Sequence, residues 1–387
     1  MNDFIYLDNA ATTRVKEEVL EAMLPYFCES YGNPAAIYSP AGKAAKAVGL
    51  ARQQVADVIG VKREEIYFTA GGSESDNWAI RGVYEMLSGK GNHIITTKVE
   101  HHAVINTCKY LEGLGAKVTY LSVDEYGMIS LEELKAAISP QTILISVMAA
   151  NNEVGTIMPL EQIGEIAREH KVLFHTDAVQ AYGHIPLDAE KMHIDLLSAS
   201  GHKLGGPKGI GFLYVKKGLK LPPLIYGGGQ ERGRRGGTLN VPGIVGMGCA
   251  AELALKAMNE QMKQVMYLRD CFAEKLLEEI PEAVLNGHPY NRLPGNVNVT
   301  IPGVEGESVL ILLDQRGVCA SSGSACSMAQ EGPSHVLLAM GLTQEEARGA
   351  IRFSLSEENT EEELDKAVHV LKEIVVHLRE IMLQKYT

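Results

Sequence analysis

Short apolar runs alternate with longer amphipathic stretches through the first half of the chain. The runs with the length and composition of buried strands span residues 65–70, 93–97, 117–123, 142–148, 171–177, 194–200 and 209–215. The helical patterns between the earlier runs span residues 74–88, 102–113, 131–138 and 160–170. This alternation predicts a largely parallel seven-stranded sheet covered by helices. A short loop joins the last two runs, which favours an antiparallel strand at that place.

The pattern changes after the glycine-rich segment 227–237. A long helical pattern runs from about 243 to 280, and a closing amphipathic helix runs from about 360 to 385. Between them lie a strand over 296–301 and a helix over 306–315. Because 387 residues exceed one ordinary core, we expect a second, smaller α/β domain here.

Composition narrows the class of protein. The apolar fraction of 45% and the charged fraction of 22% are typical of a soluble globular chain. A net charge of -12 argues against nucleic-acid binding as the main task. No apolar run approaches the roughly 20 residues of a membrane helix, and the N-terminus lacks the features of a secretory signal. We therefore predict a cytoplasmic protein that neither enters a membrane nor binds nucleic acid directly.

The chain has six cysteines, and no two of them form a C-x-x-C pair. This spacing argues against a disulfide framework and against a zinc site, so no metal is expected. Apolar, helix-like surroundings predict core positions for Cys28, Cys108, Cys249 and Cys271. Cys319 ends a strand-like run and is interpreted as a packing residue, with a resolving thiol as the alternative. Cys326 differs, because "SSGSACSM" surrounds it with small residues typical of a mobile loop.

A lysine lies among small and polar residues in "SASGHKLGGPKG". Lys203 follows a predicted strand, and Ser200 and His202 beside it can donate hydrogen bonds to an anion. A lysine amine in a partly desolvated pocket loses its proton more easily and can form a Schiff base. The alternative is an ordinary solvated charge in a loop.

The segment "HTDAVQAYG" places Asp177 at the end of an apolar strand. Ligand sites of open parallel sheets lie at such carboxyl ends. A carboxylate there can bind the ring nitrogen of pyridoxal phosphate and keep it protonated, and Gln180 could reach the ring hydroxyl. The alternative is an aspartate that caps the next helix.

Two further segments follow strands and open helices. In "TAGGSESDNWAI" the backbone N–H groups of Gly71, Gly72 and Ser73 can bind a phosphate, although the dinucleotide spacing G-x-G-x-x-G is absent. In "VEHHAV" the adjacent His101 and His102 cannot share a face. One of them would stack on an aromatic cofactor, whereas a metal pair would need further ligands.

Polar residues elsewhere are candidates for anion binding. Asn152 in "AANNEVG" could bind a ligand carboxylate or the ring hydroxyl, with a simple turn as the alternative. Arg352 in "AIRFSLS" could bind a substrate carboxylate through two hydrogen bonds, with an exposed edge arginine as the alternative. In "GGGQERGRRGGT" Thr238 could bind a phosphate across a subunit boundary, and the acidic net charge disfavours a nucleic-acid role for the arginines.

Together these segments resemble a known family. The motifs that carry the resemblance are, in order, "LDNAATT", "GGSESDN", "EHHAV", "NNEVG", "HTDAVQ", "SGHK", "GGGQERGRRGGT", "SSGSAC" and "IRFSL". As a set they are similar to the cysteine desulfurases of the NifS/IscS type, in the class V aminotransferase branch of pyridoxal-phosphate enzymes. Ala70 and Ser73 stand where relatives often have Ser and Thr, which keeps the backbone donors and a hydroxyl group.

The resemblance implies an α/β protein with the type I fold of pyridoxal-phosphate-dependent transferases. A large domain over residues 15–257 would bind the cofactor. A small domain of residues 1–14 and 258–387 would carry a cysteine loop at about 320–333. Enzymes of this type are usually homodimers, and we expect the same here.

The resemblance also implies roles for single residues. Lys203 would hold the cofactor as a Schiff base, and His101 would stack on its ring and help to move protons. The full set of implied cofactor contacts is Gly72, Ser73, His101, Asn152, Asp177, Gln180, Ser200, His202, Lys203 and, from the partner subunit, Thr238. Asn152 and Arg352 would fix the substrate carboxylate, and Cys326 would be the nucleophile.

The implied reaction converts L-cysteine to L-alanine and leaves a persulfide on Cys326. Small residues around this thiol would let it reach the pocket and then an acceptor protein, such as an iron–sulfur scaffold or a transfer-RNA thiolation enzyme. The alternatives are a selenocysteine lyase, an aminotransferase or another class V enzyme, and a non-catalytic sulfur-transfer scaffold. The sequence leaves open the acceptor, a housekeeping or nitrogenase-specific role, and the choice between cysteine and selenocysteine.

Overall fold

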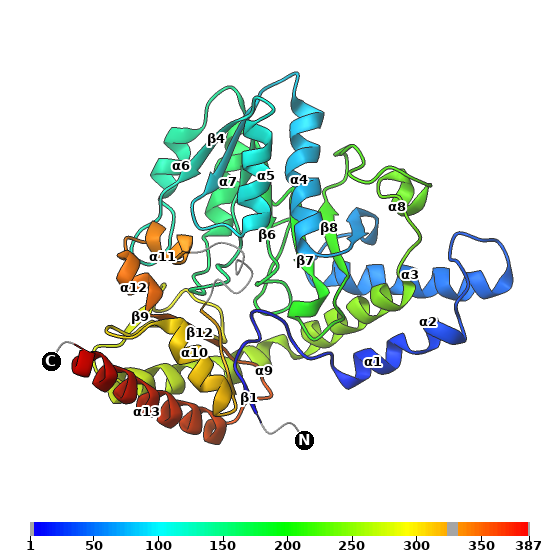
Figure 1. Cartoon of the computed structure of the whole chain (residues 1–387). Helices are drawn as coiled ribbons and strands as arrows, with labels where there is room; N and C mark the ends of the chain where they lie inside the picture. Colours follow the sequence, from blue (N-terminus) through cyan, green and yellow to red (C-terminus); the bar gives the residue numbers. More distant parts are fainter. Residues whose placement is uncertain (1–3, 323–331, 386–387) are drawn as a thin grey trace.

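The chain is described by a computed structural model that covers residues 4–322 and 332–385. Cys326 and most of the predicted cysteine loop lie outside the described residues. The structure contains a seven-stranded sheet in the order β2-β8-β7-β6-β5-β3-β4 (Figure 1). Its strands are β2 (Ile66–Thr69), β3 (His93–Thr97), β4 (Lys117–Leu121), β5 (Thr142–Ser146), β6 (Leu173–Asp177), β7 (Leu196–Ser200) and β8 (Gly211–Val215).

The sheet confirms the seven predicted strands and their mainly parallel arrangement. β8 runs antiparallel to both β2 and β7, whereas the remaining neighbouring pairs are parallel. The short connection between β7 and β8 is the physical reason, because a parallel partner would need a long crossover.

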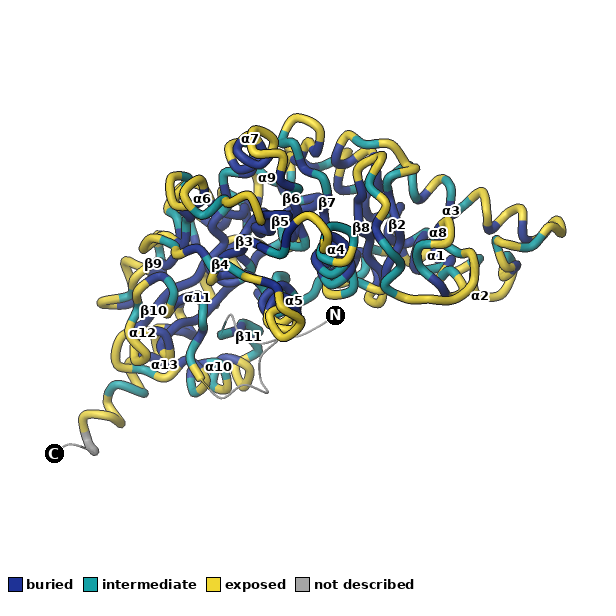
Figure 2. The backbone as a smooth tube through the Cα atoms, turned by 90° about the horizontal axis from the view of Figure 1, so that it is seen from above, coloured by how far each residue is buried: buried dark blue, intermediate teal, exposed yellow. Residues whose placement is uncertain are grey.

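Successive side chains along each strand point to opposite faces of the sheet, and each face has its own hydrophobic core. Phe68, Ile95 and Ile145 belong to the larger core, and their neighbours Tyr67 and Ile94 belong to the core on the opposite face. The face of the larger core is covered by α1 (Glu17–Met23), α3 (Ser39–Asp57), α6 (Leu131–Ala137), α7 (Leu160–His170) and α9 (Val241–Glu279). The other face is covered by α4 (Gly72–Leu87) and α5 (His102–Glu112). Figure 2 shows the strands buried between helices whose outer sides are exposed.

A second group of elements has its own core. Its antiparallel sheet has the order β12-β10-β9, and a short parallel pair joins β1 to β11. The elements are β1 (Ile5–Tyr6), β9 (Val284–Asn286), β10 (Asn296–Thr300), β11 (Val318–Cys319), β12 (Ala350–Ser354), α10 (Gly306–Gln315) and α13 (Glu361–Lys385). The N-terminal strand therefore pairs with a strand more than 300 positions away, which local patterns do not reveal.

α9 passes from one core to the other. Its residues up to Met258 belong to the larger core, and its residues from Val265 belong to the second core. The predicted domain boundary at 257/258 falls inside this helix and stays a prediction. By length and composition α9 is also a candidate membrane span, although Glu252 and Lys256 interrupt its apolar residues. However, 56% of its apolar window is buried inside the protein, as in the core helix of a globular fold.

Short elements complete the chain. They are α2 (Pro25–Cys28), η1 (Arg63–Glu65), η2 (Gly201–Lys203), α8 (Gln230–Gly233), α11 (His335–Ala339) and α12 (Gln344–Arg348). The core prediction was right for Cys108 and wrong for Cys28, which is exposed at the end of α2. Cys249 and Cys271 are half-buried, since they lie at the edges of the buried stripe of α9. The cysteines among the described residues form no disulfide.

Candidate functional site

The candidate site lies where the central parallel strands end. β6 ends at Asp177, and β7 ends at Ser200 and leads directly into η2, which contains Lys203. β6 and β7 are neighbours, with Asp177 opposite Ser198 in the register. Because parallel strands end at the same edge of a sheet, the predicted carboxylate and lysine are brought to one place.

Lys203 is buried, with 9% of its surface exposed. Its Nζ donates hydrogen bonds to the carbonyl oxygens of Ala10 and Ala11, at 2.5 and 2.8 Å. Gln180 donates to the same Ala10 oxygen at 3.0 Å. The N-terminal segment therefore holds two predicted site residues together, and the interpretation of Lys203 as a solvated loop charge was wrong.

The Asp177 carboxyl group is buried beside this lysine. Burial raises its pKa to about 6, while the hydrogen bond from the Val179 N–H, at 2.9 Å, and the charge of Lys203 oppose this rise. At pH 7 the group is thus mainly ionised, although it is inside the protein. The bond from Val179 shows that Asp177 also shapes the turn that follows its strand.

His101 and His102 point to different partners, as predicted. His101 precedes the first residue of α5, and its Nδ1 accepts the Ala103 N–H at 3.1 Å. Burial, and then the charges of His102, Lys203 and His335, lower the pKa of His101 to about 4. Its imidazole is therefore neutral at pH 7 and carries its proton on Nε2. The ring of His102 lies 4.6 Å from that of His335.

The N-terminus of α4 provides the candidate phosphate site. Gly72 begins this helix and is buried, and a Cβ there would come within 2.5 Å of a Val179 methyl group. Ser73 is exposed beside it, and Ser200 is buried at the end of β7. His202 is half-buried, and its Nδ1 lies 3.1 Å from the Thr12 hydroxyl. Free N–H groups at such a helix end attract anions.

The arginine-rich segment 227–238 is engaged within the chain. Arg235 forms an ion pair with Glu74 at 2.9 Å, and Arg232 donates to the Ile66 carbonyl and lies over the Tyr67 ring. Arg232 and Arg235 are thus engaged in contacts within the chain, whereas a nucleic-acid site would need arginine side chains that are free to bind phosphates. Thr238 is exposed in the loop before α9, and its predicted role concerns a second subunit.

Arg352 and Asn152 are brought together on the side of the second core. Arg352 Nη1 donates to the Asn152 carbonyl oxygen at 2.8 Å, and Nη2 binds the Asp8 carboxylate at 2.8 Å. Arg352 is buried, so its interpretation as an exposed edge residue was wrong. Sequence reasoning missed Asp8, although it belongs to the quoted motif "LDNAATT".

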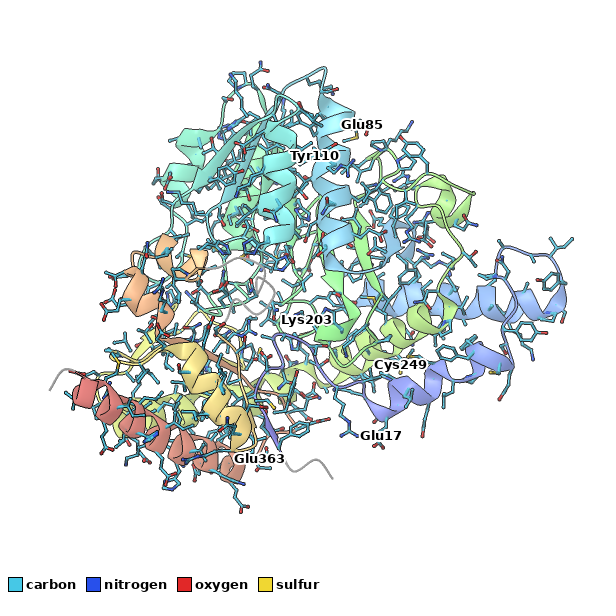
Figure 3. All side chains as sticks on the ribbon, in the orientation of Figure 1. Glu17, Glu85, Tyr110, Lys203, Cys249 and Glu363 are labelled. Carbon is cyan, nitrogen blue, oxygen red and sulfur yellow. The ribbon has the colours of Figure 1, made fainter. Side chains whose placement is uncertain are left out.

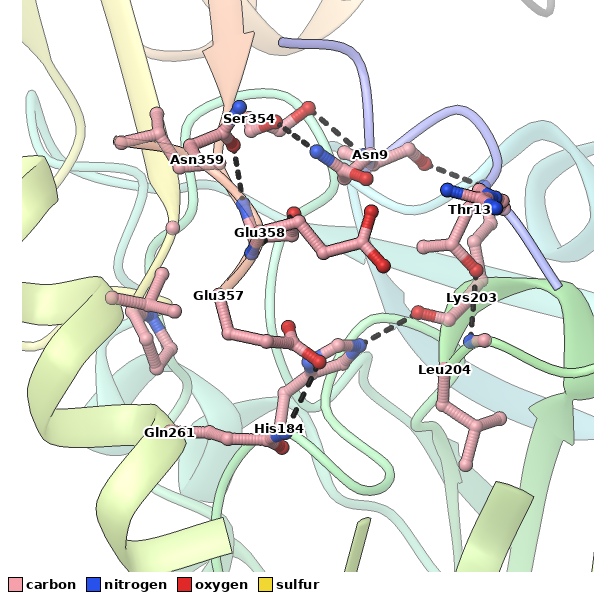
Figure 4. A pocket seen from close by; sticks show the side chains of 18 of the residues that line it. Asn9, Thr13, His184, Lys203, Leu204, Gln261, Ser354, Glu357, Glu358 and Asn359 are labelled. Atoms are coloured by element: carbon pink, nitrogen blue, oxygen red, sulfur yellow. Dashed lines mark hydrogen bonds between the residues drawn. The ribbon is translucent and has the colours of Figure 1, made fainter. Parts of the chain in front are cut away.

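A cavity of about 460 Å³ adjoins Lys203. Its lining includes Asn9, His184, Gln261 and Glu357, and Figure 4 shows these side chains around it. Figure 3 places Lys203 where the two groups of elements meet. Gln180 and Lys203 line this cavity, whereas Asp177 and His101 are not part of its lining. The cavity therefore lies beside the N-terminal segment and not beside the Asp177 carboxylate.

Sequence reasoning also missed three buried ionisable residues: Asp76, Glu100 and His175. Asp76 lies on the buried stripe of α4, between Gly72 and Ala79, where an apolar residue is expected. A charged residue on an apolar stripe is the signal that could have revealed it. Among the described residues there is no group of three or more His, Cys, Asp or Glu side chains that could hold a metal ion.

The side chains suit a cofactor that has an aldehyde, a basic ring nitrogen and a phosphate. Lys203 offers an amine, Asp177 a buried carboxylate, His101 a neutral imidazole, and Gly72 a close approach to a helix N-terminus. The fold and this group of side chains define the class: an α/β enzyme of type I fold that depends on pyridoxal 5′-phosphate.

Comparison with known families identifies the chain more closely. The model of the family "Aminotransferase class-V" matches residues 5–367, and the chain belongs to this family. A "Cysteine desulfurase IscS" of Methanosarcina thermophila is 54% identical over 378 residues, which cover 98% of this chain and 93% of that protein. A "Cysteine desulfurase IscS" of Clostridium botulinum (strain Hall) is 52% identical over 383 residues, covering 98% and 96%.

Solved structures are similar over nearly the whole chain. A structure described as "NIFS-LIKE PROTEIN" has a TM-score of 0.91 and 41% identity, and the match covers 97% of this chain and 100% of that one. The structure "SspA in complex with cysteine" has a TM-score of 0.82 and 41% identity, with coverage of 92% and 100%. These relatives confirm the type I fold predicted from the sequence.

Proposed function

We propose that this protein is a pyridoxal-phosphate-dependent cysteine desulfurase. The observation that carries the proposal is the buried Lys203 amine at the same sheet edge as the buried Asp177 carboxylate. Relatives about 50% identical over nearly the full chain bear this name, and a similar structure is described as a complex with cysteine. The same geometry alone would also suit other class V enzymes.

Each residue near this edge has a role in the proposed reaction. When bound, pyridoxal phosphate supplies an aldehyde that reacts with amines and a ring that accepts electrons. Lys203 Nζ would hold it and, once released, could carry a proton to or from the substrate. Asp177 would bind the ring nitrogen, and Gln180 would bind the ring oxygen. His101 would lie on the ring and offer its Nε2–H as a hydrogen-bond donor.

Phosphate and substrate would be held by different elements. Gly72 and Ser73 at the start of α4 would bind the phosphate together with Ser200, His202 and, from a second subunit, Thr238. Arg352 and Asn152 would hold the substrate carboxylate. Arg352 already binds Asp8, so a substrate would have to share the guanidinium group with this carboxylate.

Cys326 would take the sulfur atom. Its thiolate forms a bond to the substrate sulfur, the carbon–sulfur bond breaks, and its electron pair returns to carbon, which gains a proton. Alanine leaves, and a persulfide remains on the protein. Atoms and electrons balance without a further reactant. An acceptor protein, such as an iron–sulfur scaffold or a transfer-RNA thiolation enzyme, would then take the sulfur in the cytoplasm.

The sharpest test compares Cys326→Ala with Cys319→Ala as the matched control. After turnover with cysteine, mass spectrometry should locate an added sulfur on Cys326 in the natural protein and in the control. Cys326→Ala should lack it and should release alanine more slowly by roughly two orders of magnitude or more. Unchanged alanine release would reject the persulfide route and favour another class V reaction. A protein that binds no cofactor would favour the scaffold alternative.

We also propose a homodimer. Apolar side chains of Leu20, Leu24, Phe27 and Ile37 are exposed on and after α1 and α2, and a second copy could cover them. Residue Thr238, which would serve the partner's phosphate site, is exposed as this arrangement requires. A light-scattering mass of a single chain in a fully active sample would contradict the proposal.

A further inference from the structure

A buried polar network lies beneath the edge that carries Asp177, and the reaction described above does not use it. Its members are Asp76 on α4, Ser146 at the end of β5, His175 on β6 and Ser198 on β7. All four are at most 1% exposed. Buried polar groups lower the stability of the fold unless they form hydrogen bonds, so we ask how these four side chains are paired.

The side chains form a continuous chain of contacts. His175 Nδ1 lies 2.9 Å from the Ser146 hydroxyl, and His175 Nε2 lies 3.0 Å from the Ser198 hydroxyl. Asp76 Oδ1 lies 3.6 Å from His175 Nε2 and has no hydrogen-bond partner among the described residues. Burial lowers the pKa of His175 to about 3, so this histidine is neutral and does not form an ion pair with Asp76.

Several charges face one another here. Asp76 is close to the carboxyl groups of Asp177 and Glu100, and the cation Lys203 acts on Asp177. Burial, and then the proximity of Asp177, raise the pKa of Asp76 well above its ordinary value, while a hydrogen bond with Ser198 opposes this rise. Three buried carboxyl groups beside one cation cannot all be ionised.

Some of these carboxyl groups must therefore be protonated while another carries the negative charge. Asp177 receives the Val179 N–H and the field of Lys203, both of which favour its ionised form. Asp76 Oδ1 receives no such donor. Asp76, like Glu100, consequently keeps a proton, and Asp177 is the group that keeps the charge.

We propose that Asp76 is a positioning residue that stays protonated and confines the negative charge to Asp177. With Asp76 protonated, Ser198 can donate to His175 Nε2, and His175 Nδ1–H can donate to Ser146. No second charge then competes with Asp177 for the cofactor ring nitrogen. α4 adds a geometric link, because it begins at the candidate phosphate site and carries Asp76 one turn later. The link to the ring nitrogen rests on the proposed function.

Difference infrared spectroscopy of the cofactor-free protein tests the proton directly. We compare Asp76→Asn with Glu85→Gln, a control on the exposed side of the same helix. Asp76→Asn should remove the C=O band of one protonated carboxyl group, whereas Glu85→Gln should remove carboxylate bands. Loss of carboxylate bands in Asp76→Asn at neutral pH would overturn the proposal.

A second variant tests the hydrogen-bond chain and guards against failure of the first to fold. Ser198→Ala should shift the protonated-carboxyl band of Asp76, because it removes the hydroxyl group that interacts with Asp76. A protonated-carboxyl band that does not move would overturn the proposal, including when Asp76→Asn does not fold.

The bound cofactor gives an independent readout. Asp177→Asn should lower the pH at which the absorbance of the loaded protein changes, whereas Asp76→Asn should leave this pH in place because a neutral group replaces a neutral group. A downward shift of about one pH unit or more in Asp76→Asn would show that Asp76 was ionised and would overturn the proposal. A protein that shows no cofactor absorbance would contradict the proposed function and not the protonation of Asp76. The infrared measurement on the cofactor-free protein tests that protonation independently.

Discussion

Arg352 is a buried side chain that supports the fold and that we propose to bind the substrate carboxylate. Its guanidinium group binds Asp8 of the N-terminal segment and the backbone of Asn152. Both bonds are made to groups near the candidate site, so they orient the side chain before a substrate arrives. Arginine is suited to this position because its fixed fork of donors can bind two acceptors at once.

Replacement of Arg352 by Gln should raise the KM for cysteine by roughly 10- to 100-fold, with a smaller change in kcat. The reason is the loss of about 1.5–3 kcal/mol from a charged hydrogen bond to the substrate carboxylate. Steady-state kinetics measure both constants.

The control for this prediction is Asp8→Asn, which removes the competing carboxylate and leaves Arg352 in place. It should not raise KM as Arg352→Gln does. If both variants raised KM equally, the increase would come from loss of the Asp8–Arg352 ion pair, which maintains the fold. That result would contradict binding of the substrate by Arg352.

α4 connects the candidate phosphate site to the packed sheet. Its first turn faces Val179 after β6, its second turn carries Asp76, and its buried stripe packs across the strands of the sheet. A rigid helix transmits the position of the sheet to the proposed phosphate-binding end. We therefore expect the packing around Gly72 to affect cofactor affinity.

Gly72→Ala should weaken cofactor binding by about tenfold or more, because the new methyl group overlaps Val179 Cγ2 and must displace the start of α4. The double variant Gly72→Ala/Val179→Ala removes the obstructing methyl groups and should recover most of the affinity. Titration of the apoprotein with pyridoxal phosphate measures this. A double variant as weak as Gly72→Ala would show that the overlap is not the cause.

Most elements near the site could be predicted from the sequence because each has a clear period. The strand predicted at 93–97 and the helix predicted at 160–170 match β3 and α7 residue for residue. α3 was not predicted, since its buried stripe consists of alanine and valine and contrasts weakly with its surroundings. β1 and β11 have two residues each and form only because they meet each other.

The N-terminal segment connects the parts of the molecule. It pairs with β11 at Ile5 and reaches Lys203 at Ala10, and its Lys16 binds Glu357 at 2.6 Å. The two cores thus share one short piece of chain and the long helix α9. Buried acids such as Glu100 make the stability of the whole molecule depend on pH.

Glu100 should account for a measurable part of this dependence. Burial raises its pKa from the ordinary value of 4.5 to about 8, against hydrogen bonds from Met148 and Thr97. Between these values the folded protein binds the proton more tightly than the unfolded chain. Its contribution to stability is therefore complete below pH 4.5 and is lost as the pH rises toward 8, with a limiting slope of about 1.4 kcal/mol per pH unit.

Glu100→Gln removes this titration. Relative to the natural protein, the variant should become steadily more stable between pH 5 and 8, as measured by urea unfolding of the apoprotein. Glu85→Gln, on an exposed surface, should show no such trend. Parallel stability curves for Glu100→Gln and the natural protein would contradict the expected pKa.

The sequence by itself determined the seven strands, most helices, and the residue types at the candidate site, because periodicity and local motifs are properties of neighbouring residues. Lys203, Asp177 and His101 were all named from such motifs. The tertiary structure alone decided that Ala10 and Ala11 hold Lys203, that Asp8 binds Arg352, and that Asp76 lies beneath Asp177. These contacts join residues far apart in the chain, and burial changes their charges only when the fold removes water from all of them together.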